Sequence, residues 1–212
     1  MKSTGFTMLE LIISLALLSI VSVLGFAVMA ASVKVMGQAA TQEVVDTDLR
    51  DVINAMRNEL ELASKTTNAA LVPPLSAVAV TNNPVAGAPI EIAFQKPLNS
   101  TGNNWSTAIR YRFINEDANG NGRLDTSEDT DNNRVLTRRI VRIQDMNGNG
   151  STADAGETTP VGGANDISNV AMALDASRSM LTITLTASRR LSNDPSRPPI
   201  TGSVTTNIYL VN

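Results

Sequence analysis

The sequence contains no cysteine and no histidine, and only 3% of its 212 residues are aromatic. Without cysteine, no disulfide can stabilise the fold, and thiol usage says nothing about the redox compartment. Without histidine, the chain lacks the commonest general base and the commonest transition-metal ligand. The remaining residues contain no nucleophile–base pair, phosphate-binding loop or catalytic metal cluster. These absences argue against an enzyme.

A strong charge of either sign is also missing, because the formal net charge is −3. A mild acidic balance gives no reason to expect non-specific binding to nucleic acid. Arginines do gather in two regions, which could form a patch that grips DNA or an acidic partner. We favour the simpler interpretation, in which they lie on solvated strand faces and balance acidic loops. These arginines are Arg134, Arg138, Arg139 and Arg142, and nearer the C-terminus Arg189, Arg190 and Arg197.

Apolar residues concentrate near the N-terminus, where residues 11–33 carry no charge. A helix of this length measures about 35 Å, enough to cross a hydrocarbon core of about 30 Å. One carboxylate, Glu10, stands at the start of the run. In a secretory signal peptide cleaved after Ala30, basic residues would precede a shorter apolar run. In a plain signal anchor, Glu10 would lie at the membrane interface, where its cost is small.

A third interpretation uses the residues that precede the run. "MKSTG" followed by "FTMLELIISLALLSIVSV" resembles the class III signal of type IV pilins and type II secretion pseudopilins. The short basic leader ends in Gly5, Phe6 follows, and Glu10 is the fifth residue after the cut. The resemblance, which covers residues 1–30, implies that a prepilin peptidase removes residues 1–5 and that the new amino group of Phe6 is methylated.

The same resemblance implies a location and partners. The subunit would wait in the bacterial inner membrane with its C-terminal domain in the periplasm. It would then join other pilins or pseudopilins in a pilus or pseudopilus that reaches the cell surface. In such a filament the apolar helices form a core of low dielectric, where an unpaired carboxylate is expensive. We therefore expect Glu10 to fix the stagger of subunits by pairing with the Phe6 amine of a neighbour.

Helical periodicity continues beyond Lys34. One apolar stripe follows a period of 3.6 residues, and charged residues occupy the other face. The pattern predicts a continuous helix from about Phe6 to Ser64, roughly 85 to 90 Å long. Its first half would lie in lipid or a filament core, and its second half would pack on a globular domain. The stripe consists of Val45, Leu49, Val52, Ile53, Met56, Leu60 and Ala63.

Beyond the helix the pattern changes to strands. Residues 65–108 are rich in proline and contain one short strand candidate, Ile90–Phe94, and Trp105, which we expect to pack beneath this loop. Four longer segments follow strand patterning between Gly, Asn and Pro turns. They are residues 108–114, 135–143, 180–188 and 203–211.

Helix followed by strands predicts an α+β fold, in which the long N-terminal helix packs on a largely antiparallel β-sheet. This is also the pilin architecture. The expected parts are a leader, a transmembrane or filament-core helix, an amphipathic helix and a β-rich globular domain, at residues 1–5, 6–33, 34–64 and 65–212.

"DANGNGRLDTSE", residues 117–128, matches the calcium-loop pattern D-x-[DN]-x-[DN]-G-x5-E at every constrained position. Calcium takes roughly six to eight oxygen ligands, and a loop of about twelve residues can wrap one ion. The alternative is a tight hairpin turn built from Asn-Gly. Because the flanks are strands, we expect a structural site rather than a sensor. The predicted ligands are Asp117, Asn119, Asn121, the carbonyl of Arg123, Asp125 through water, and Glu128.

"DMNGNGSTADAGE", residues 145–157, begins with the same pattern, but its later acids fall one residue late. A weaker second calcium site and an ordinary turn both remain open. The ligands of such a site would be Asp145, Asn147, Asn149, Asp154 and Glu157.

The sequence thus predicts a non-enzymatic filament subunit with a calcium-stabilised loop. In its length, long β-region and loop insertions it resembles a minor pilin or minor pseudopilin of the PilW or GspJ kind, of a type IV pilus or a type II secretion system. Two alternatives remain: a secreted soluble calcium-binding protein, and a pilus-borne adhesin or DNA receptor.

Overall fold

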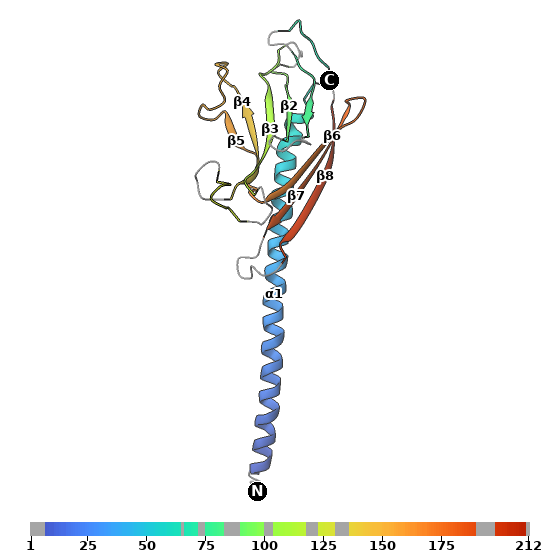
Figure 1. The fold of residues 1–212 in the computed structure, drawn as a ribbon. Coiled ribbons are helices and arrows are strands. Elements are labelled where there is room, and N and C mark those ends of the chain that lie inside the picture. Colours follow the sequence, from blue (N-terminus) through green and yellow to red (C-terminus); the bar gives the residue numbers. More distant parts are fainter. Residues whose placement is uncertain are drawn as a thin grey trace. The chain divides into compact units, whose positions relative to one another are not determined.

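The computed structural model describes residues 7–64, 66–71, 75–82, 90–99, 104–117, 123–129, 136–189 and 198–210. Within them the chain forms one long helix followed by strands (Figure 1), which confirms the predicted α+β class. The helix is α1, Met8–Leu60. The strands are β1 Ala79–Thr81, β2 Glu91–Phe94, β3 Ile109–Asn115, β4 Arg138–Gln144, β5 Thr158–Pro160, β6 Ile167–Leu174, β7 Met180–Arg189 and β8 Ile200–Tyr209.

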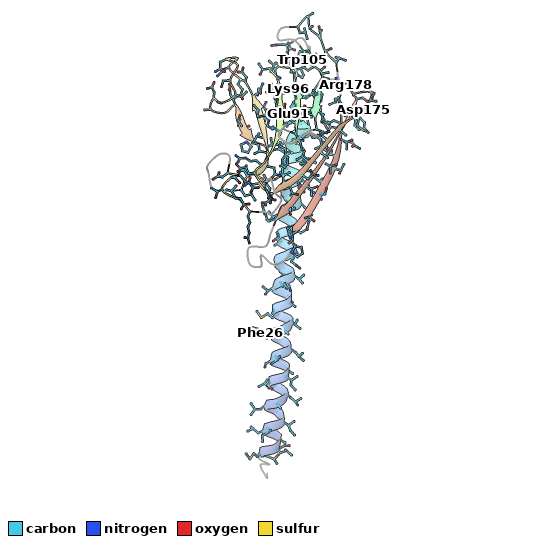
Figure 2. All side chains as sticks on the ribbon, viewed as in Figure 1. Phe26, Glu91, Lys96, Trp105, Asp175 and Arg178 are labelled. Atoms are coloured by element: carbon cyan, nitrogen blue, oxygen red, sulfur yellow. The ribbon has the colours of Figure 1, made fainter. Side chains whose placement is uncertain are left out.

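The chain divides into two compact units, Met1–Thr41 and Gln42–Asn212. In the first unit, α1 is a bare helix in which every residue from Met8 to Ala40 is exposed. Figure 2 shows its side chains, Phe26 among them, projecting around the helix. The most apolar window of α1 has a mean hydropathy of 2.7, and none of it is buried. By length and composition this helix can cross a membrane.

The serine hydroxyls of this apolar segment are satisfied within the helix. Ser14, Ser22 and Ser32 each donate a hydrogen bond to the carbonyl oxygen four residues earlier, at 2.7, 2.7 and 2.9 Å. A hydroxyl paired in this way can enter a hydrocarbon environment without leaving an unsatisfied donor.

In the second unit, the strands form two antiparallel sheets. The first has the order β1-β2-β3-β4-β5 and the second the order β6-β7-β8. The prediction of antiparallel pairing is confirmed, and the strands are divided between two sheets. Strand β6 of the second sheet was not predicted, because it alternates alanines with larger apolar residues and alanine has little strand propensity. Strands β1 and β5 have only three residues each, too few to show a period.

The predicted apolar stripe of α1 forms the centre of the core. All seven of its residues, from Val45 to Ala63, are buried. They pack with inward-facing residues of both sheets, such as Ile109 of β3, Ile183 of β7 and Ile208 of β8. The helix ends at Leu60 rather than at Ser64 because the next residues tighten the chain, with Ala63 donating to the carbonyl of Leu60 at 3.0 Å.

A polar network joins the end of α1 to the first sheet. Glu59 accepts hydrogen bonds from Arg142 Nε at 2.8 Å, the Tyr111 hydroxyl at 2.7 Å and Lys96 Nζ at 2.5 Å. Burial alone would raise the pKa of Glu59, but these hydrogen bonds outweigh it and lower the pKa to about 2. Burial, together with the bond to Glu59, raises the pKa of Tyr111 well above its usual value. Glu59 is thus held ionised by its two cationic partners.

Candidate functional site

The N-terminus of α1 is closed by a reciprocal pair of residues. The backbone N–H and the hydroxyl of Thr7 each donate to Glu10 Oε2 at 2.9 Å, and the Glu10 N–H donates to Thr7 Oγ1 at 3.3 Å. This is a capping box, in which a threonine at the N-cap and a glutamate three residues later satisfy each other's backbone donors. Glu10 therefore has a role within its own subunit.

The sequence contained a signal for this capping box that our interpretation did not use. A threonine three residues before a glutamate, directly ahead of an apolar run, is the expected pattern. The capping box uses only one carboxylate oxygen of Glu10, because both Thr7 bonds go to Oε2. Gly5 and Phe6, the predicted processing residues, lie outside the described residues.

The first predicted calcium loop connects β3 to β4, whose last register pair is Asn115 with Arg138. Its first ligand, Asp117, is buried and forms an ion pair with Arg138 Nη1 at 3.3 Å. The preceding residue, Glu116, accepts a hydrogen bond from the Thr137 N–H at 3.0 Å. Both acids thus have protein partners.

At the other end of this loop, Glu128 is also buried. Its Oε2 accepts the Asp125 N–H at 3.2 Å, and its own N–H donates to the Asp125 carbonyl at 2.9 Å. Arg123 and Asp125 are exposed. Asn119, Asn121 and Gly122 lie outside the described residues, so the ligand set as a whole stays a prediction.

The second loop connects β4 to β5 and is described throughout. The Asp145 carboxylate accepts the N–H groups of Gly148 and Gly150, at 2.6 and 2.8 Å. Gly150 has a φ of 82°, so the sixth position makes the sharp turn expected of it. The amides of Asn147 and Asn149 donate to Asp154 Oδ2 at 2.8 and 2.6 Å and lower the pKa of that carboxyl.

Glu157 closes the base of the second loop. It is 2% exposed, and its Oε1 accepts the N–H groups of Met146 and Asn147 at 2.9 and 3.3 Å. Its other oxygen, Oε2, is buried and has no hydrogen-bond partner in the described parts of the chain. Across those parts, no three acidic residues are grouped closely enough to hold a metal ion. The second loop is held mainly by its own hydrogen bonds.

Three described arginines of the two basic regions form ion pairs within the fold. Arg142 pairs with Glu59, Arg138 with Asp117, and Arg189 with Asp166 and Asp48. These arginines balance acids as expected, but Arg138 and Arg142 are mostly buried rather than solvated, and Arg142 pairs with an acid of α1 rather than of a loop. Arg134, Arg190 and Arg197 lie outside the described residues. Trp105 is buried, as expected for a packing residue.

Residues 1–26 match the family described as "Prokaryotic N-terminal methylation motif". The match covers the predicted leader, Phe6, Glu10 and most of the exposed apolar segment of α1. It identifies a class III prepilin signal, and the chain is therefore type IV pilin-like in its N-terminal segment. A signal peptide cleaved after Ala30 fits this motif less well. No curated protein and no solved structure matches the chain.

Proposed function

We propose that the protein is a non-enzymatic subunit of a type IV pilus or type II secretion pseudopilus, and that it is a minor component of the filament. The single observation that carries the proposal is the methylation motif at residues 1–26, on a helix whose apolar side chains are all exposed between Met8 and Ala40. Large contiguous apolar surfaces mark membrane or protein contacts. A helix of this kind suits both membrane storage and a filament core.

In this proposal, prepilin peptidase cleaves between Gly5 and Phe6, and the freed amine of Phe6 pairs with Glu10 of a neighbouring subunit. The capping box supports it, because Thr7 occupies Oε2 and orients the carboxylate of Glu10. Oε1 has no partner among the described residues and can accept the cation. Pairing of these opposite charges would favour one axial stagger between neighbouring subunits. The N-terminal residue of the mature chain, Phe6 or Ala31, separates this proposal from a secreted soluble protein.

Calcium binding belongs to the proposal as a structural stabiliser of the loop at residues 117–128. The complete match of that loop to the calcium pattern supports it. The buried, unpartnered Oε2 of Glu157 also gives the second loop an oxygen that a cation could satisfy. With few charged ligands, the expected dissociation constant is about 0.1 to 1 mM, as in extracellular modules.

Calcium is expected to raise the melting temperature of the full chain in detergent. At a calcium concentration about ten times the dissociation constant, binding stabilises the folded state by about 1.4 kcal/mol. For a domain of this size, that amounts to about 3 to 6 °C. Glu128→Gln should abolish the shift, and Asp154→Asn should leave most of it. Magnesium at equal concentration serves as the control, and an unchanged melting temperature at millimolar calcium would refute the site.

A further inference from the structure

The turn that joins β6 to β7 contains a strained residue. Arg178 has a φ of 57°, and the described parts of the chain contain no other non-glycine residue with a positive φ. The Arg178 N–H donates to the Asp175 carbonyl at 3.0 Å, so residues 175–178 form a β-turn whose last residue is left-handed. Glycine is favoured at this position, because it adopts the left-handed conformation without strain.

The Arg178 side chain makes no polar contact that would offset this strain. It is exposed, and its guanidinium has no ion pair or hydrogen bond with a described residue. The Asp175 carboxylate holds the turn instead. Its Oδ1 accepts the N–H groups of Ser179 and Met180 at 2.7 and 2.9 Å, and its Oδ2 accepts the hydroxyls of Ser177 and Ser179. Figure 2 shows Arg178 and Asp175 on this turn. Backbone strain that local contacts do not explain is a sign of function.

Arg178 lines a cavity of about 600 Å³ between the first sheet and the second. Val80 of β1 and Leu174 of β6 are half-buried at the rim of the core and give the cavity an apolar wall. Ligand pockets typically have volumes of about 300 to 1,000 Å³ and combine apolar walls with a few polar groups. The other described lining residues are Asn82, Ala173, Asp175 and Ala176.

We propose that this cavity binds a carboxylate that is attached to a small apolar group. Arg178 pairs with the carboxylate, because the planar guanidinium can donate two parallel hydrogen bonds to it. Val80 and Leu174 contact the apolar group. Asp175 also lines the cavity, but its oxygens are already engaged by the four donors of the turn. The charge left unpaired at this cavity is therefore positive. This inference goes beyond the filament proposal and does not depend on it.

The melting temperature of the full chain in detergent tests the proposal with two probes. N-acetylleucine represents the C-terminal residue of a peptide, and butanoate represents a free aliphatic acid. One charge-assisted pair and a small apolar contact support a dissociation constant on the order of 1 mM. At about 10 mM, the better ligand should raise the melting temperature by about 3 to 6 °C. A larger shift with N-acetylleucine assigns the site to a peptide terminus, and a larger shift with butanoate assigns it to a free acid.

Two control compounds separate the parts of the ligand. N-acetylleucinamide lacks the carboxylate, and acetate lacks the apolar group. At the same concentration and ionic strength, each should shift the melting temperature by less than about 1 °C. An equal shift with N-acetylleucine and its amide, or no shift with either carboxylate probe, would overturn the proposal.

Variants of Arg178 separate the ligand contact from the strain. Arg178→Gly should lose the shift caused by the carboxylate probe and should raise the melting temperature of the ligand-free chain by about 1 to 3 °C. Arg178→Gln keeps the strained side chain and should lose the shift without that gain. Arg110→Gln, which removes another exposed arginine, should keep the full shift. A full shift in Arg178→Gln, or a ligand-free Arg178→Gly less stable than the wild type, would contradict the proposal.

Discussion

Glu10→Gln is expected to leave the chain in the membrane and to exclude it from filaments. Gln at the third position of a capping box still accepts the Thr7 hydrogen bonds, so the start of α1 should remain closed. What the substitution removes is the negative charge. If that charge offsets the Phe6 amine of a neighbour, its loss leaves a cation unpaired in a medium of low dielectric, at a cost of several kcal/mol. The subunit should then be abundant in membranes and nearly absent from sheared filaments.

Thr7→Ala is the matched control for this experiment, since it removes the cap hydroxyl and keeps the charge. Loss of an N-cap costs about 1 kcal/mol of helix stability. Incorporation of Thr7→Ala into filaments should therefore stay close to that of the wild type. If the two variants enter filaments equally well, Glu10 acts only as a helix cap, and the pairing hypothesis fails.

Glu59→Ala is expected to lower the free energy of unfolding by about 2 to 3 kcal/mol, because it leaves two partly buried cations, Arg142 and Lys96, without their carboxylate. The control is Glu61→Ala, which removes the more exposed pair with Arg57 and should cost less than about 0.5 kcal/mol. Denaturant unfolding in detergent measures both. Equal effects of the two substitutions would show that the network does not anchor α1 to the first sheet.

The Glu59 carboxylate also makes the free energy of unfolding depend on pH. The pKa of Glu59 is about 2 in the folded protein against an ordinary value of 4.5, so its contribution to stability is fully present above pH 4.5. The contribution falls as the pH drops from 4.5 towards 2, where Glu59 takes up a proton in the folded state. A shift of this size corresponds to roughly 3 kcal/mol. In Glu59→Ala the unfolding free energy should change less with pH over this window.

Helical periodicity was the feature that sequence predicted best. The stripe from Val45 to Ala63 is buried in full because spacing alone decides which side of a helix faces a core. Strand patterning located β3 and β7, whose inward residues Tyr111 and Ile183 are buried as expected. Apolar and polar residues alternate so regularly in β3 and β7 that these strands can be predicted without knowledge of the strands they pair with.

Other features depend on contacts between distant residues and could not be predicted in this way. Nothing local to Glu59 indicates that Arg142, 83 positions later, would pair with it. The partner of Asp117 is likewise an arginine of the next strand. An acid chosen as a calcium ligand by pattern can thus have a structural ion pair as well. The Thr7–Glu10 capping box, in contrast, depends only on residues three positions apart, so the sequence pattern is sufficient to predict it.

The central claim is that the chain is a prepilin whose mature N-terminus is a charged partner for Glu10. Intact mass and N-terminal sequencing of the subunit recovered from membranes and from sheared filaments test it most directly. The expected result is a chain that begins at Phe6 and carries one added methyl group on its amine. A chain that begins at Met1 or at Ala31 would place no such amine next to Thr7 and would contradict the claim.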